Sequence, residues 1–210
     1  MDRLKTTLLA ATCLAIAAVA PAHAGPVTYS SYSVLNNQDV TLTDAALHIT
    51  DERGGSGQIT LEGTNTPGGF IKTWCVDVAH YLQWSGSFTT GGFLDGGVGN
   101  KINALMTHVV PTLAAGYDNS SALQVAIWKA EYGKALTVSA PESVLSLAHS
   151  YLSNVHDGTW ATDPTMRVAV LAGGGSTQDQ AYLTPVPEPA SMAVVATGLI
   201  GLGLIRRKRA

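Results

Sequence analysis

Two side chains in the middle of the chain are of types that can react with each other. Cys75 stands in the segment Trp74-Cys75-Val76-Asp77, and Gln124 stands in Leu123-Gln124-Val125-Ala126-Ile127-Trp128. A thiol and a carboxamide can condense, with loss of ammonia, to an internal thioester. This bond is an activated acyl group, because a thiol with a pKa of about 8.5 leaves far more readily than an alcohol. An external amine that attacks the former glutamine carbonyl becomes covalently attached, once, without turnover.

The number of cysteines makes Cys75 a candidate for chemistry. The chain has two cysteines, and Cys13 lies in a predicted signal peptide, so the exported part keeps Cys75 alone. It cannot form an internal disulfide, although it is expected in a compartment where disulfides form. Each residue taken singly also has an ordinary interpretation. Free cysteine is among the most buried residue types, and a single glutamine on a helix carries no signal.

Together the two segments resemble the thioester domains of bacterial surface adhesins. Those domains carry an aromatic-Cys motif on a strand and a hydrophobic-Gln-x-x-hydrophobic-aromatic motif near the start of a helix. The resemblance covers about residues 70–135 and implies a thioester between Cys75 and Gln124, flanked by the aromatic residues Trp74 and Trp128, with Asp77 as a polar group of the site. Many relatives carry Tyr or Phe at the position of Trp74. The resemblance implies adhesion by covalent capture of surface amines, with no cofactor, no metal and no enzymatic turnover.

The positions of the two tryptophans follow from elementary geometry. Gln124 and Trp128 are four residues apart and share one face of a helix, so Trp128 is predicted to cover the bond. Trp74 precedes Cys75 on a strand and points to the opposite face of the sheet, so it is predicted to lie in the core.

Two other functions stay open. The first is a non-reactive component of an exopolysaccharide matrix, a β-rich module that binds matrix polysaccharide or protein and keeps Cys75 as packing. The second is a secreted cysteine hydrolase that pairs Cys75 with a histidine. His80, five residues after Cys75, would point to the opposite face of a regular strand. His108 is expected at the surface or at a helix end. The remaining histidines after the predicted signal peptide are His48, His149 and His156.

The sequence pattern around these residues predicts strands followed by helices and then further strands. This order indicates an α+β domain, a β-sheet or sandwich with an inserted helical block. The longest expected strand runs over 70–82 and on to about residue 87, and a glycine-rich loop is expected over 91–99. Shorter strands are expected over 27–34, 40–43, 45–50, 58–62, 168–171 and 181–183, with turns at 36–37, 53–57 and 64–69.

Three helices are predicted between the early and late strands. Apolar residues at helical spacing run from 102 to 113, and Pro111 ends or kinks that helix. Residues 118–121 offer N-caps for a helix through Glu131 that Gly133 closes, and a third helix runs from Pro141 to Val155. Residues 173–187 are predicted to be partly linker.

The first 24 residues predict a secretory signal peptide. Arg3 and Lys5 precede an apolar run, and Ala22-His23-Ala24 is an A-x-A site, so cleavage is expected after Ala24. The exported domain is then expected over 25–185.

The last residues, 186–210, resemble a PEP-CTERM sorting signal. Pro187, Glu188 and Pro189 precede an apolar segment, predicted as a transmembrane helix over 190–205, and four basic residues follow. The resemblance implies a substrate of an exosortase-type enzyme in a Gram-negative, exopolysaccharide-producing bacterium. The precursor would be tethered to the inner membrane, and the product would reach the cell surface or the extracellular matrix.

The charge balance excludes some partners. Residues 25–185 hold six Lys and Arg against thirteen Asp and Glu, a net charge of −7, compared with −3 for the whole chain. A domain this acidic is a poor candidate for binding nucleic acid or anionic lipid. The sequence has no P-loop, dinucleotide fingerprint or zinc cluster.

Overall fold

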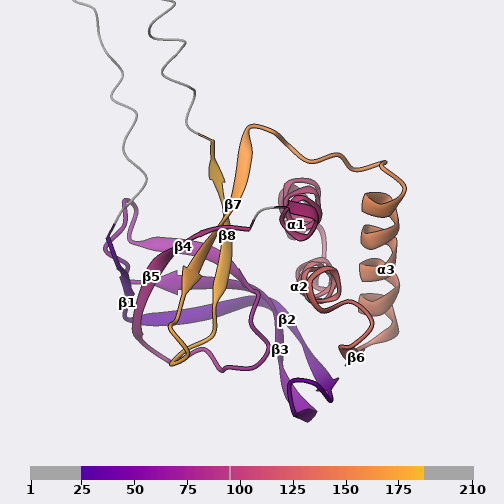
Figure 1. Ribbon diagram of the computed structural model, residues 1–210, viewed down its shortest axis with the longest axis horizontal. Helices are drawn as coiled ribbons and strands as arrows, with labels where there is room; N and C mark the ends of the chain where they lie inside the picture. Colours follow the sequence, from indigo (N-terminus) through magenta and orange to yellow (C-terminus); the bar gives the residue numbers. More distant parts are fainter. Residues whose placement is uncertain (1–24, 95, 187–210) are drawn as a thin grey trace, which may run out of the picture.

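The computed structural model describes residues 25–94 and 96–186, and these residues form one antiparallel sheet covered on one side by helices (Figure 1). The sheet has eight strands in the order β1-β5-β7-β8-β4-β3-β2-β6. Their bounds are β1 Val27–Tyr29, β2 Ser31–Asp44, β3 Ile49–Glu62, β4 Phe70–Cys75, β5 Gly86–Phe93, β6 Thr137–Ser139, β7 Met166–Ala172 and β8 Gln180–Pro185.

The sheet curls strongly, as its connectivity requires. Only Ser30 separates β1 from β2 along the chain, although six steps separate them in the strand order. The backbone N–H of Ser30 donates to the carbonyl of Glu62 on β3 at 2.9 Å, so the β1 end of the sheet returns to the β2–β3 end. The strands therefore enclose an apolar interior in which Leu61, Phe88 and Leu171 are almost completely buried.

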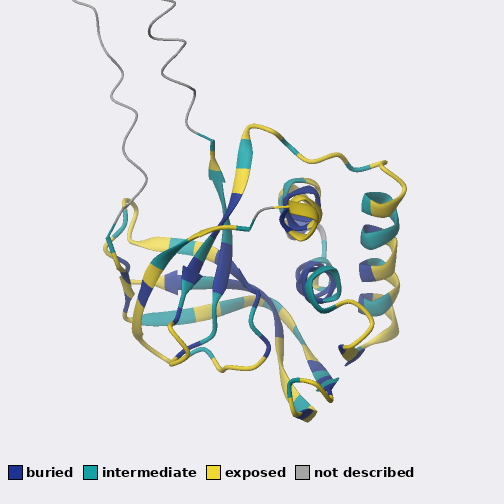
Figure 2. Ribbon diagram, in the orientation of Figure 1, coloured by how far each residue is buried: buried dark blue, intermediate teal, exposed yellow. Residues whose placement is uncertain are grey.

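The helical block lies between β5 and β7 in the chain and on one side of the sheet in space (Figure 1). It consists of α1 (Gly96–Val109), the 3₁₀ helix η1 (Val110–Ala115), α2 (Tyr117–Tyr132) and α3 (Glu142–His156). Helix α2 contacts β2, β3 and β4 on one side and α1 and α3 on the other, and Figure 2 shows it as largely buried. The α+β class with an inserted helical block is confirmed, with one curled sheet.

The predicted turns at 36–37 and 53–57 are wrong, because both segments lie inside the long β2–β3 hairpin. The chain reverses instead at residues 45–48, within a predicted strand. Asp44 causes this reversal, since its carboxylate accepts hydrogen bonds from the backbone N–H groups of Ala46 at 2.9 Å and Leu47 at 3.2 Å.

The predicted long strand from Phe70 is also wrong, because β4 ends at Cys75 and β5 is a separate strand. The Asp77 carboxylate accepts from the N–H of Ala79 at 2.8 Å and so turns the chain directly after the strand. The predicted loop over 91–99 is mostly regular, since its first part completes β5 and its last part begins α1. Within the predicted partial linker over 173–187, residues 173–179 form the turn between β7 and β8, and Gln180–Pro185 forms β8, which pairs with β4 and β7.

The start of α2 differs from the expected capping. The helix begins at Tyr117, and no side chain caps it. The hydroxyl groups of Ser120 and Ser121 bond the β2–β3 hairpin instead. Ser120 accepts from the N–H of Gln58 at 2.7 Å and donates to the carbonyl of Leu35 at 3.0 Å. The helix ends as predicted at Gly133, whose φ is +62° and whose N–H donates to the carbonyl of Lys129 at 3.0 Å.

Within the part of the chain that the structure describes, no helix has the length and apolar character needed to cross a membrane. The predicted signal peptide over 1–24, the segment over 190–205 and the motif Pro187-Glu188-Pro189 lie outside the described residues.

Candidate functional site

The end of β4 and the buried face of α2 bring Cys75 and Gln124 into direct contact. The backbone N–H of Cys75 donates to Gln124 Oε1 at 3.0 Å, and Gln124 Nε2 donates to the carbonyl oxygen of Cys75 at 2.8 Å. The two residues are only 2% and 1% exposed. The carboxamide of Gln124 is thus fixed at both ends against the residue that carries the thiol.

The sheet explains why this contact forms. The β3–β4 register places Ile59 opposite Thr73, so a continued ladder would place Gly57 opposite Cys75. The pairing stops before that point, and the N–H of Gln58 bonds Ser120 on α2. The side-chain amide of Gln124 replaces the missing strand as the hydrogen-bonding partner of Cys75. This satisfies two buried backbone groups, which is a structural role in itself.

The sulfur atom of Cys75 has two recorded partners. Its thiol donates to the carbonyl oxygen of Asp77 at 3.0 Å, and Trp128 Nε1 donates to the sulfur at 3.4 Å. Burial raises the pKa of the thiol well above its ordinary range, although the hydrogen bond that the Trp128 indole donates to the sulfur acts in the opposite direction. The thiol is therefore protonated at neutral pH and shielded from bulk reagents.

One face of α2 lines the segment from Cys75 to Val78. Gln124 and Trp128 contact Cys75, and one turn later the hydroxyl of Tyr132 donates to the carbonyl of Val76 at 3.0 Å. Trp74 is 2% exposed within the core. Its indole nitrogen is buried without a hydrogen-bond partner among the described residues.

Asp77 and His80 form a close pair on the loop after β4. Asp77 Oδ2 lies 2.6 Å from His80 Nδ1, and the His80 side chain is 43% exposed. The expected alternation of Cys75 and His80 on opposite strand faces does not apply, because the strand ends at Cys75. The recorded partners of the thiol are Asp77 and Trp128, and neither is an imidazole.

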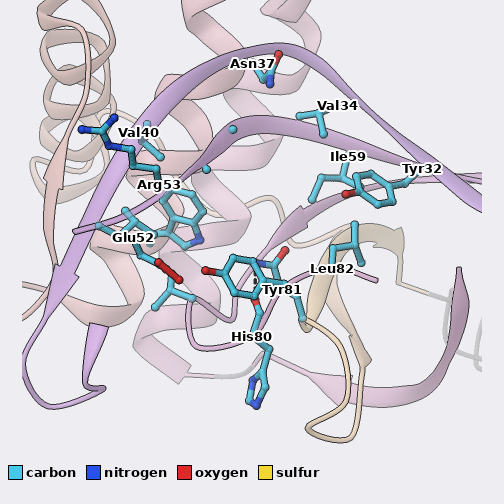
Figure 3. Close-up of a pocket in the computed structure, with 16 residues that line it drawn as sticks. Tyr32, Val34, Asn37, Val40, Glu52, Arg53, Ile59, His80, Tyr81 and Leu82 are labelled. Carbon is cyan, nitrogen blue, oxygen red and sulfur yellow. Dashed lines mark hydrogen bonds between the residues drawn. The ribbon is translucent and has the colours of Figure 1, made fainter. Parts of the chain in front are cut away.

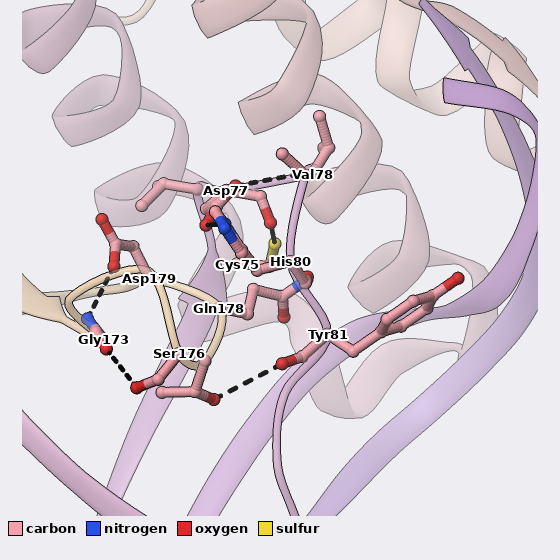
Figure 4. Close-up of polar contacts among 12 residues, drawn as sticks. Cys75, Asp77, Val78, His80, Tyr81, Gly173, Ser176, Gln178 and Asp179 are labelled. Atoms are coloured by element: carbon pink, nitrogen blue, oxygen red, sulfur yellow. Dashed lines mark hydrogen bonds and ion pairs between the residues drawn. The ribbon is translucent and has the colours of Figure 1, made fainter. Parts of the chain in front are cut away.

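The turn between β7 and β8 holds this loop in place (Figure 4). The N–H of Val76 donates to the carbonyl of Asp179 at 3.1 Å, and that of Gln178 to the carbonyl of Tyr81 at 3.2 Å. Gln178 Nε2 also donates to the carbonyl of His80 at 3.1 Å. The conformation of residues 76–81 therefore depends on a segment about a hundred positions away in the sequence.

Sequence reasoning missed Glu131 as a member of this site. Its Oε2 atom is buried and has no hydrogen-bond partner among the described residues. Burial, followed by the charges of Asp77 and Asp179, raises the pKa of this carboxyl to about 7. The available signal was its position seven residues after Gln124, which puts it on the same side of the helix.

A pocket of about 380 Å³ lies beside the site, and Trp128 and Val78 form part of its wall. Figure 3 shows Tyr32, Ile59 and Leu82 at one end and Glu52 and Arg53 at the other, with Tyr81 between them. Much of the wall is apolar, and the charged side chains come from β3. Trp128 is thus shared between the pocket and the sulfur of Cys75.

His108 is not part of the site around Cys75 and Gln124. It is on α1, donates a hydrogen bond from Nδ1 to the carbonyl of Ala104 at 2.9 Å and stacks on Trp160 with ring centroids 5.1 Å apart. Among the described residues, no group of three or more His, Cys, Asp or Glu side chains is placed to hold a metal ion.

Comparison with known families finds a PEP-CTERM protein-sorting motif at residues 185–209. No match was found among curated proteins or among solved structures. None of these comparisons supports the resemblance of residues 70–135 to thioester domains, which stays a hypothesis. The chain carries a PEP-CTERM sorting motif, and this motif marks an exported protein whose membrane-anchored precursor is cleaved by an exosortase-type enzyme.

Proposed function

We propose that Cys75 and Gln124 form an internal thioester and that the exported protein uses it to attach covalently to amines at a surface or in a matrix. The observation that carries this proposal is the pair of hydrogen bonds between the Gln124 carboxamide and the Cys75 backbone. They hold the amide beside the residue that bears the sole sulfhydryl group of the described chain.

The reaction balances without any other reagent. The Cys75 sulfur attacks the side-chain carbonyl carbon of Gln124, the carbon–nitrogen bond breaks, and ammonia leaves with the thiol proton. In the capture step an amine attacks the same carbon, the carbon–sulfur bond breaks, and the proton from the amine returns to sulfur. The products are a secondary amide on Gln124 and a free Cys75 thiol.

Burial suits such a bond, because an activated acyl group must be kept from water until its target arrives. Cys75 and Gln124 are almost fully buried, and the Trp128 indole is bonded to the sulfur. The pocket that shares Trp128 is the approach we assign to the amine. Its apolar wall fits an alkyl stem, and Glu52 supplies an opposite charge for an ammonium group.

A non-reactive matrix module is the second candidate, and one observation favours it. The amide of Gln124 already satisfies the Cys75 backbone in place of a strand, so its presence needs no chemistry. The aromatic residues Tyr32 and Trp84, whose rings lie 5.5 Å apart, and the exposed Tyr81 are side chains of the type that bind sugar rings.

Peptide mapping by mass spectrometry tests the proposal. Under non-reducing, acidic conditions the thioester predicts a species in which the Cys75 and Gln124 peptides are joined and weigh one ammonia less than their sum. Treatment with methylamine should separate them and add methylamine to the Gln124 peptide.

Substitution of Cys75 by Ala or of Gln124 by Glu should each abolish the joined species. Gln83→Glu is the matched control, because Gln83 is an exposed glutamine whose recorded hydrogen bonds use only its backbone. Separate, full-mass peptides in the unsubstituted protein would leave the matrix module as the better account.

A further inference from the structure

Two surface pockets adjoin at the side chain of Tyr81. The pocket of about 380 Å³ beside the site and a second pocket of about 280 Å³ share Glu52, Val78, His80 and Tyr81 in their walls. Both lie between the β2–β3 hairpin and the loop over 78–82, so they form two parts of one cleft, here called the Tyr81 cleft. Ligand pockets commonly measure about 300–1,000 Å³, so the whole cleft has room for linked rings.

The loop that forms one wall of the cleft uses its backbone internally. The carbonyl of Tyr81 accepts from the N–H of Gln178 at 3.2 Å and from Thr177 Oγ1 at 3.4 Å, and the carbonyl of His80 accepts from Gln178 Nε2 at 3.1 Å. Figure 4 shows the Tyr81 ring pointing away from the β7–β8 turn that makes these bonds. This wall therefore offers side chains to a ligand, above all the ring of Tyr81, a residue that is 63% exposed.

Two further aromatic side chains lie at the larger pocket. Tyr32 lines it, and the ring of Trp84, a residue that is 67% exposed, lies 5.5 Å from the Tyr32 ring. Single exposed apolar residues are common on protein surfaces, but aromatic residues that gather at one cleft mark a binding surface. The faces of these rings carry partial negative charge, so they attract both the C–H bonds of a sugar ring and positively charged groups.

Glu52 supplies a negative charge to this cleft. It borders both pockets, and Figure 3 shows its carboxylate turned toward the Tyr81 hydroxyl. Within the described part of the chain the one ion pair joins His80 to Asp77, so Glu52 has no cationic partner there. Arg53 lines only the larger pocket, and Figure 3 shows its guanidinium directed away from Tyr81. The unpaired carboxylate beside an aromatic ring favours a ligand that carries an ammonium group.

We propose that the Tyr81 cleft binds a chain of amino sugars and that these sugars carry the amines captured at Gln124. The sugar rings match the aromatic faces, and their ammonium groups match Glu52. The net charge of −7 over residues 25–185 disfavours an acidic polysaccharide at the same place. The capture part of this inference rests on the proposed thioester, whereas the binding part does not.

Trp128 joins the cleft to the reactive pair. It lines the larger pocket, and its Nε1 atom donates to the sulfur of Cys75. A chain held over Tyr81 therefore has its amines beside the indole that covers the pair. In capture an unprotonated sugar amine attacks the side-chain carbonyl carbon of Gln124, the carbon–sulfur bond breaks, and a proton from the amine returns to sulfur. The product is an amide between the sugar nitrogen and Gln124.

Isothermal titration calorimetry at pH 5.5 tests the binding part. The exported protein is first treated with methylamine and dialysed, so that no thioester takes part. The probes are a β-1,4-linked glucosamine hexamer and the N-acetylglucosamine hexamer of the same linkage, which lacks the positive charges. We expect the glucosamine hexamer to bind about tenfold more tightly, because it alone can pair with Glu52 and with the aromatic faces through its charge.

Substitutions with matched controls locate the site. Glu52→Gln should weaken binding of the glucosamine hexamer about fivefold. Glu142→Gln removes the same charge from the exposed first turn of α3 and should change the affinity by less than about twofold. Tyr81→Ala should weaken binding of both hexamers about fivefold. Phe70→Ala should leave it unchanged, because Phe70 is 51% exposed but lines neither pocket.

Three calorimetric results would each overturn the inference. They are equal affinity for the two hexamers, equal effects of Glu52→Gln and Glu142→Gln, and no binding of either hexamer. Hexalysine that displaces the glucosamine hexamer and binds Tyr81→Ala without loss would also overturn it, because that result indicates a peptide partner.

Peptide mapping of the untreated protein at pH 8 tests the capture part. The glucosamine hexamer should couple to Gln124 faster than methylamine at an equal concentration of unprotonated amine, and Tyr81→Ala should remove this advantage. If the joined Cys75–Gln124 species is absent, the proposed function and the capture part fail together, while calorimetry still decides the binding part. If the joined species is present but the hexamer has no advantage, only the assignment of the captured amine is overturned.

Discussion

The Glu131 carboxyl, partly buried near the end of α2, has a consequence for folding stability that does not depend on the thioester. Its pKa is raised from an ordinary value of 4.5 to about 7 in the folded protein, by burial first and by Asp77 and Asp179 next. Between these two pH values the folded state holds a proton that the unfolded state has released. The contribution of the neutral acid to stability is therefore complete below about pH 4.5 and is lost as the pH rises to 7.

The size of the effect follows from the same values. At about 1.4 kcal/mol per pH unit, a rise from 4.5 to about 7 gives a ceiling of roughly 3 kcal/mol. The side chain is only partly buried, so solvent screening reduces this to about 1.5 kcal/mol. Glu131→Gln removes the charge and keeps the shape, and it should stabilise the protein by about this amount at pH 8.

Urea unfolding of both proteins at pH 4.5 and pH 8 measures this difference. The stability gain of Glu131→Gln should be present at pH 8 and close to zero at pH 4.5, because the wild-type carboxyl is neutral there when folded. Glu142→Gln on the first turn of α3 is the control, since this exposed carboxylate should give a gain at neither pH. Equal stability of wild type and Glu131→Gln at pH 8 would refute the electrostatic reasoning.

Two further predictions concern the elements that build the site. Ser121→Ala removes a hydroxyl that accepts from the N–H of Gln38 at 2.9 Å and donates to the carbonyl of Ser56 at 2.6 Å, so we expect a loss of about 2 kcal/mol in urea unfolding. Ser153→Ala, on the partly exposed side of α3, should change stability by less than about 0.5 kcal/mol, and an equal loss in both would contradict this account. Gly99→Ala would place a Cβ 1.8 Å from the Leu94 carbonyl oxygen and should lower the melting temperature. The same change at Gly97, where a Cβ meets nothing within 4 Å, should be neutral or stabilising by up to about 1 kcal/mol, and a reversed order of the two variants would show that α1 packs differently.

Local sequence signals predicted the elements that depend on near neighbours. The helical spacing in 102–113 and 144–155, and the closing glycine at 133, produced helices close to those observed. The strand boundaries were predicted less well. The polar segments at 36–37 and 53–57 carry turn residues, yet both lie inside the β2–β3 hairpin. Ser120 and Ser121 on α2 bond the irregular backbone of the hairpin there. A local sequence pattern cannot reveal a hydrogen-bonding partner that lies so far away in the chain.

The sequence by itself identified the sorting motif, and it predicted the signal peptide, the single cysteine of residues 25–185 and the candidate pair Cys75 and Gln124, because each of these is a matter of residue type and short-range order. Only the tertiary structure decided that the Gln124 amide meets the Cys75 backbone, since the pairing of β3 with β4 has to stop two residue pairs before Cys75 for the helix to reach it. Only the tertiary structure brought Glu131 into the site as well, because burial and the charges of Asp77 and Asp179 arise when β4, α2 and the turn before β8 pack together.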